Sequence, residues 1–212
     1  MTNTPLSLRR IYKVWLPLAA SWLLMGMELP ILSAFVARLA EPKINLAAYG
    51  GIVFPLALII EAPVIMLLAA STALSKDWAS YLKLRKFMLY AGGLLTALHL
   101  FTALSPFYYF IAEGLLDAPP EIIEPARLGL IIMTPWTWSI AYRRLNQGVM
   151  IRFGHSNIIG IGTGIRLGMD ILVLSIGYFL GGHGIVVATS AVAASVIAEA
   201  IYIGFRVQAV LN

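Results

Sequence analysis

Two glutamates lie in the middle of apolar stretches that are long enough to cross a membrane, and a proline follows each of them two positions later. They are Glu28 with Pro30 and Glu61 with Pro63. A carboxylate at the bilayer centre costs about 2.5–3.5 kcal/mol on insertion scales. A proline removes one backbone hydrogen bond and frees a carbonyl, so helix kinks are predicted at Pro30 and Pro63. Because neither residue type favours insertion, the repeated pairing indicates a polar site inside the membrane that binds protons, cations or a polar substrate.

Four more ionisable residues lie near the centres of later apolar segments: His99, Arg166, Asp170 and Glu199. Arg166 and Asp170 are four positions apart, share one face of a helix and are predicted to pair, for structure or for transport. Glu199 is interpreted as a coupling residue or as part of a network between helices, and His99 as a hydrogen-bonding residue between helices. The residues predicted to contact the substrate or the coupling ion are Glu28, Glu61, Asp170, Arg166 and Glu199.

A third proline, Pro135, stands among threonines and tryptophans in the stretch Thr134–Trp138. A kink is predicted there, with the freed carbonyl bonded by a threonine hydroxyl; the tryptophans fit a substrate wall or simple packing. The glycine-rich stretch 160–164 indicates close helix approach rather than a phosphate cradle, because no strand precedes it. The chain contains no cysteine and no HExxH or GxSxG pattern, so no enzyme activity, cofactor or metal site is predicted.

Composition is that of a membrane protein. Of 212 residues, 60% are hydrophobic and 12% charged, with a mean hydropathy of +0.86, whereas soluble domains are about 45–50% apolar and about 25% charged. Apolar stretches of about 20 residues span the hydrocarbon. The prediction is an all-α integral membrane protein, a single membrane domain over residues 1–212, with six transmembrane helices at about 11–38, 50–74, 86–113, 124–149, 156–180 and 185–207.

The basic residues are distributed unevenly over the predicted loops and helix ends. Eleven fall on one side of the membrane: Arg9, Arg10, Lys13, Lys76, Lys83, Arg85, Lys86, Arg143, Arg144, Arg152 and Arg206. The other side carries Arg38, Lys43 and Arg127 with the acidic loop Glu113, Asp117, Glu121 and Glu124. The positive-inside rule predicts a multi-pass protein of the inner (plasma) membrane with both termini in the cytoplasm. This topology explains the net charge of +5, so the predicted partner is the lipid bilayer and not nucleic acid.

Parts of the sequence resemble a known group of exporters. Glu28-Leu-Pro-Ile-Leu-Ser-Ala-Phe-Val-Ala-Arg38, followed by Asn45-Leu-Ala-Ala-Tyr-Gly50, is similar to the opening of multidrug and toxic compound extrusion (MATE)-type exporters. Tyr142-Arg-Arg-Leu-Asn-Gln-Gly-Val-Met-Ile-Arg152 and Gly162-Thr-Gly-Ile-Arg166-Leu also resemble this multidrug/oligosaccharidyl-lipid/polysaccharide flippase superfamily, and within it bacterial relatives of the progressive ankylosis protein. The resemblance covers roughly residues 10–207 and its motifs are loose.

The resemblance implies two six-helix lobes that rock about a substrate between them, driven by protons or sodium. It also implies that Glu28, an acid on the first helix near a proline bend, takes part in cation coupling. This chain has only one lobe's worth of helices. The expected protein is therefore a half-length secondary transporter that resembles one lobe of a MATE-type exporter and works as a homodimer or with a second six-helix lobe.

Two questions stay open at the level of sequence. The substrate is a small molecule or ion: the buried acids favour organic cations or protons, whereas Arg38, Arg127 and Arg166 favour anions. The alternative function is a non-transporting membrane subunit or assembly partner, in which the buried acids are structural. A truncated, inactive fragment is a further reading of the half-length chain.

Overall fold

The computed structural model describes residues 8–211, and these contain helices and no strand. Residues 1–7 and 212, which the predicted single domain includes, lie outside the described residues. The elements are α1 (Leu8–Gly26), α2 (Glu28–Val36), α3 (Pro42–Ala48), the π-helical turn η1 (Tyr49–Val53), α4 (Phe54–Ile65), α5 (Leu67–Leu74), α6 (Trp78–Leu104), α7 (Phe107–Tyr109), the π-helical turn η2 (Phe110–Leu115), α8 (Pro120–Arg152), α9 (Ser156–Phe179) and α10 (Gly184–Leu211).

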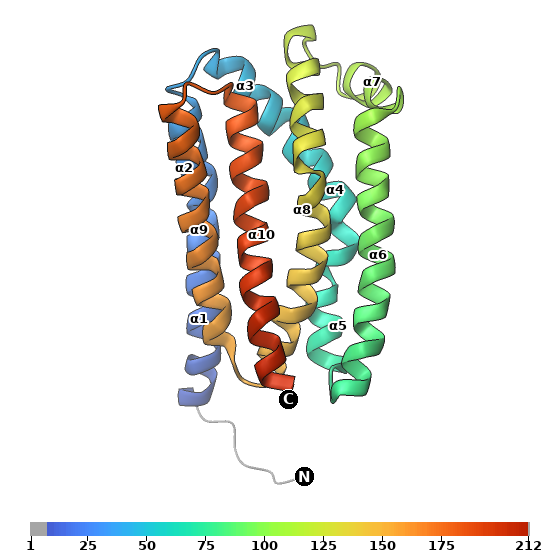
Figure 1. The fold of residues 1–212 in the computed structure, drawn as a ribbon, viewed down its shortest axis with the longest axis vertical. Helices are drawn as coiled ribbons and strands as arrows, with labels where there is room; N and C mark the ends of the chain where they lie inside the picture. Colours follow the sequence, from blue (N-terminus) through green and yellow to red (C-terminus); the bar gives the residue numbers. More distant parts are fainter. Residues whose placement is uncertain (1–7, 212) are drawn as a thin grey trace.

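These elements form six long helical segments that run side by side along the bundle (Figure 1). Within the described chain, five segments are long and apolar enough to cross a membrane: Ile11–Val36, Pro42–Leu74, Trp78–Leu104, Ser156–Phe179 and Gly184–Val210. The chain therefore has the build of a multi-pass, all-α membrane protein. Compared with the predicted ranges, the third helix begins earlier, at Trp78, and ends earlier, at Leu104, because α7 and η2 form separate turns. The fourth is longer at both ends, from Pro120 to Arg152.

The remaining long segment, α8, is the fourth in chain order and lies at the centre of the bundle. It has 33 residues and packs against α4, α5, α6 and α10. Of the long segments in the described part of the chain, it is the one outside the apolar set. It carries charged residues toward both ends: Glu121, Glu124 and Arg127, and Arg143, Arg144 and Arg152. A helix that neighbouring helices cover on most sides does not need an apolar surface, so α8 is free to carry the polar residues of the interior.

Two of the prolines singled out in the sequence lie next to interruptions of a helix. α1 ends at Gly26 and α2 begins at Glu28, two positions before Pro30. Pro30 has no N–H for the carbonyl four residues earlier, which favours a break at this point. α4 contains Pro63 and ends at Ile65, and α5 begins at Leu67. α8, by contrast, continues as one α-helix through Pro135.

Side chains hold the ends of two helices. Asp77 and Ser80 form a capping box at the start of α6: the Asp77 carboxylate accepts from the Ser80 backbone N–H at 2.7 Å, and this hydrogen bond lowers the pKa of Asp77. At α10, the Asn45 Oδ1 atom accepts from the Ile185 backbone N–H at 2.9 Å. Asn45 thereby connects α3 to the first turn of α10 and fixes how the second and sixth segments meet.

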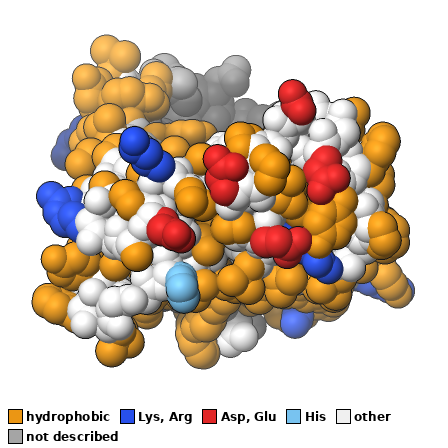
Figure 2. All heavy atoms as spheres, turned by 90° about the horizontal axis from the view of Figure 1, so that it is seen from above, with side chains coloured by type: hydrophobic (Ala, Val, Ile, Leu, Met, Phe, Trp, Pro, Cys, Tyr) orange, Lys and Arg blue, Asp and Glu red, His pale blue; other side chains and the backbone are white. Residues whose placement is uncertain are grey.

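The two ends of the bundle differ in charge. The end formed by α3, α7 and the start of α8 gathers carboxylates on its surface, as Figure 2 shows, and we call it the acidic end. α1 begins and α10 finishes at the opposite end, the basic end (Figure 1). Basic residues near it lie in the first turns of α1 and α6 and the last turns of α8 and α10: Arg9, Lys13, Lys83, Arg85, Lys86, Arg152 and Arg206.

Candidate functional site

An ion pair between the first and fifth segments lies at the centre of the candidate site. The Arg166 guanidinium on α9 donates to both carboxylate oxygens of Glu28 on α2, through Nη2 to Oε2 and through Nε to Oε1 at 3.3 Å. The predicted pairing of Arg166 with Asp170 is therefore wrong for this structure. The helix spacing of four correctly placed them on one face, but Glu28 provides the two-pronged geometry that a guanidinium prefers.

Asp170 lies one turn beyond Arg166 on α9 and is completely buried. Neither of its carboxylate oxygens has a hydrogen-bond partner among residues 8–211. The charges of Glu28 and Arg166 both act on it, the first unfavourably for a carboxylate and the second favourably. Because Glu28 already neutralises Arg166, a charged Asp170 would be an uncompensated buried anion, which is costly. The arrangement favours an Asp170 that holds a proton.

A second buried ion pair joins α8 to α10. Arg143 Nη1 donates to Glu199 Oε2 at 2.5 Å, and the two side chains are 2% and 0% exposed. Gln147 Nε2 donates to the other oxygen, Glu199 Oε1, at 3.0 Å. Glu199 is thus a member of a network between helices, one of the two interpretations that the sequence left open. Its neutral and cationic donors together satisfy the carboxylate.

The two arginines of α8 are the residues that sequence reasoning misplaced. Arg143 and Arg144 were counted among the charges at the cytoplasmic end of the predicted fourth helix, yet Arg143 is 1% exposed and Arg144 is half-buried within α8. The sequence did contain one sign of a shared polar contact in the interior, because Arg143 and Gln147 are four positions apart and so share a face of the helix. Their position makes α8 a contributor of positive charge to the interior of the bundle.

Glu61 faces this positive charge without touching it. It lies on α4, is 4% exposed, and its Oε2 atom has no hydrogen-bond partner in the described part of the chain. Arg143, Arg144 and Arg166 are the cations near enough to act on its carboxylate. Glu28, Glu61, Asp170, Arg166 and Glu199, together with Arg143 and Arg144, are linked by these charge interactions and by the two ion pairs, and we call these residues the polar core.

His99 is held as a structural link between α6 and α8. Its Nε2 atom lies 3.0 Å from the Leu130 carbonyl oxygen and its Nδ1 atom 2.9 Å from the Thr137 hydroxyl. A carbonyl only accepts, so Nε2 carries the hydrogen and Nδ1 is free to accept from Thr137. The predicted hydroxyl bond near Pro135 goes from Thr134 to the Leu130 carbonyl at 3.4 Å, not to the Ile131 carbonyl that Pro135 leaves free.

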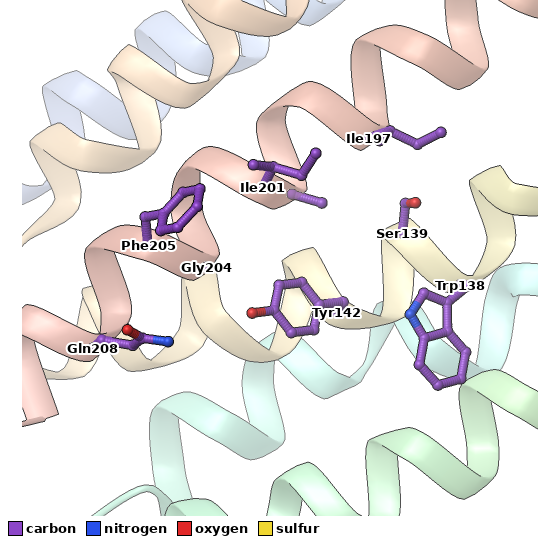
Figure 3. A pocket seen from close by; sticks show the side chains of 9 residues that line it. Trp138, Ser139, Tyr142, Ile197, Ile201, Gly204, Phe205 and Gln208 are labelled. Atoms are coloured by element: carbon purple, nitrogen blue, oxygen red, sulfur yellow. The ribbon is translucent and has the colours of Figure 1, made fainter.

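The surface is hollowed mainly outside the polar core. A groove of about 350 Å³ runs between α8 and α10, and Figure 3 shows Tyr142 of α8 beside Gly204 of α10, with Trp138 farther along. A hollow of about 400 Å³ at the acidic end is lined by Glu41, Glu124 and His183 among others. Over residues 8–211, no group of three or more histidine, aspartate or glutamate side chains could hold a metal ion.

One small cavity does reach the polar core. It measures about 40 Å³ and lies between α1, α5, α8 and α9. Arg144 and Gln147 of α8 line it together with Ser21 of α1 and Thr163 of α9. Through Arg144 and Gln147, the charged interior borders a space that small groups can enter.

Comparison with protein-family models, with curated proteins and with solved structures gives no match for this chain. The likeness to MATE-type exporters stays an expectation from the sequence, and the functional argument depends on the polar core itself.

Proposed function

We propose that this chain is one six-helix lobe of a secondary active transporter coupled to protons or other cations. The observation that carries the proposal is Asp170, a completely buried acid whose two oxygens lack a donor among the described residues, next to the Glu28–Arg166 ion pair. An acid in this position is expensive in a purely structural role, since a leucine or asparagine would serve packing better. A site that gains and loses a proton explains its presence.

The three residues form a two-state element. The Arg166 guanidinium pairs with Glu28 across the helix interface, and the Asp170 carboxyl one turn along its own helix also acts on its charge. When Asp170 releases its proton, the positive charge of Arg166 is shared by two anions and the Glu28 contact weakens. Glu28 begins α2, directly after the interruption at Met27. Proton exchange at Asp170 would therefore loosen α2 from α9 and change the bend of the first segment.

The proposal includes a second lobe and an orientation. The first and last described residues lie at the same end of the bundle (Figure 1), so a second copy inserted in the same direction would be related by an axis along the membrane normal. Basic residues at that end, together with the positive-inside rule, favour an inner-membrane protein whose basic end faces the cytoplasm. A homodimer or a separate six-helix partner would then complete the pathway, as the resemblance to half of a MATE-type exporter suggests.

The second candidate is a non-transporting membrane subunit. It is favoured by the two ion pairs Glu28–Arg166 and Glu199–Arg143, which neutralise both acids as purely structural pairs would. This function leaves Asp170 unexplained. Crosslinking in native membranes that recovers one unrelated protein and no self-dimer would support the subunit function instead.

The transport proposal is tested on the protein reconstituted in liposomes on a solid support, where pH jumps produce charge movement. We expect a transient current in the wild type that Asp170→Asn and Glu28→Gln each abolish. Glu113→Gln, at the acidic end and outside the polar core, is the control and should leave the current intact. Equal currents from the wild type, D170N and E28Q would refute the proposal.

A further inference from the structure

Arg144 is the arginine of the polar core that forms no ion pair in the described chain. Arg143 pairs with Glu199 and Arg166 with Glu28, and these are the two ion pairs between buried side chains in residues 8–211. Arg144 Nη1 donates to the Gln147 side-chain oxygen at 3.3 Å, and its Nε atom is buried with no partner in the described chain. A guanidinium with an unfilled buried N–H requires an acceptor from elsewhere.

The small cavity beside Arg144 could hold a ligand that provides this acceptor. Arg144 lines it, and no carboxylate does within the described residues, because its other polar walls are Gln147, Ser21 and Thr163. The Ser21 hydroxyl donates to the Pro17 carbonyl and the Thr163 hydroxyl to the Ile159 carbonyl. Both hydroxyl hydrogens are therefore in use, and Arg144 is the one charged residue among those that line the cavity. Its electrostatic character is positive.

The size of the cavity limits what can enter. A water molecule needs roughly 10–15 Å³ measured in this way, so about 40 Å³ admits about three atoms of that size. A carboxylate group has three heavy atoms, and its planar shape matches the two-pronged donor set of a guanidinium. The surrounding side chains Leu18, Trp22 and Met25 would contact an apolar remainder of the ligand outside.

We propose that Arg144 binds the carboxylate of a small organic anion in this cavity, and that such anions are the substrate class of the transporter. This substrate assignment rests on the proposed function; the binding site does not. The cavity lies along the last third of α8, toward the basic end, whose positive charges raise the local concentration of anions. Glu61 and Glu199 are the acids that act on Arg144. Of these two, Glu61 is the one without an ion pair in the described chain, so an arriving carboxylate competes with it.

Acetate is the probe, and saturation-transfer NMR on the protein in nanodiscs measures its binding. We expect acetate to bind the wild type and Arg144→Gln to weaken it by about tenfold or more, the loss expected for hydrogen bonds to a charged group. Arg144→Lys should retain part of the affinity, and Glu61→Gln should raise it by removing the competing carboxylate. Methylammonium, a cation of similar size, should not bind at this site.

The matched control is Arg152→Gln, two turns further along α8, where Arg152 donates to the Thr72 and Ala73 carbonyls at 3.0 and 2.9 Å and is exposed. If R152Q weakens acetate binding as much as R144Q, the effect is general surface charge and the proposal is overturned. Absence of acetate binding to folded wild type also overturns it. Asp170→Asn should leave acetate binding unchanged, so failure of the anion site and failure of proton coupling are seen in different variants.

Discussion

Removing Arg143 tests how the interior of the bundle tolerates its charges. The Arg143→Gln variant leaves the Glu199 carboxylate at 0% exposure with Gln147 as its remaining donor, where the wild type adds a contact of 2.5 Å from a guanidinium that is 2% exposed. Breaking one partner of a buried ion pair costs about 3–5 kcal/mol, because the other charge is left uncompensated. The retained Gln147 hydrogen bond places the expected loss at the lower end, about 3 kcal/mol.

The free energy of unfolding is measurable by reversible denaturation in mixed micelles of a mild and a denaturing detergent. The double variant Arg143→Gln with Glu199→Gln should recover most of the loss, since two amides replace the two charges and can still hydrogen-bond. This coupling between the two sites, rather than the size of either single effect, identifies the pair. A loss below about 1 kcal/mol in R143Q, or a double variant that is less stable than R143Q, would refute the buried pair.

Three further outcomes are expected. Gly148→Ala should lower the free energy of unfolding by about 1–3 kcal/mol, because a Cβ there would lie 2.6 Å from the Leu68 carbonyl oxygen. Gly164→Ala, which has open space around it, should leave that free energy unchanged or raise it by up to about 1 kcal/mol. Equal effects of the two substitutions on unfolding would contradict the α5–α8 contact. Asn45→Ala should cost about 0.5–2 kcal/mol as a lost cap, with hydrogen exchange of the first turn of α10 rising first. Single cysteines at Lys43 and at the end of α10 should react with impermeant thiol reagents from opposite sides of the membrane, and labelling from one side alone would refute the topology.

Membrane helices and their buried acids were predictable because both depend on local composition. A run of apolar residues identifies a span whatever its neighbours are, and an acid within it is visible at once, as with Glu61. Helix ends were less accurate where amphipathic turns continue a helix past its apolar part, as α6 does from Trp78. The π-helical turns η1 and η2 left no signal that spacing rules could detect.

The partners of the charges could not be read from one sequence. The spacing of Arg166 and Asp170 indicates only that they share a face of one helix. Which acid pairs with Arg166 depends on how α2 packs against α9. Likewise, Arg143 and Arg144 were interpreted as charges at the cytoplasmic end of a helix because they stand near the end of an apolar run. In the structure α8 continues to Arg152, and its neighbours cover these residues. Tertiary packing therefore determines which charges pair in the site, whereas composition alone was enough to predict the fold class.

The central claim is that Asp170 holds a proton beside the Glu28–Arg166 pair, and infrared difference spectroscopy of the reconstituted protein tests it directly. A protonated buried carboxylic acid has a carbonyl stretching band that carboxylates lack. The account predicts such a band in the wild type, with a component that is missing in Asp170→Asn and that Glu113→Gln retains. A spectrum that is the same in D170N and in the wild type at every pH would contradict the claim.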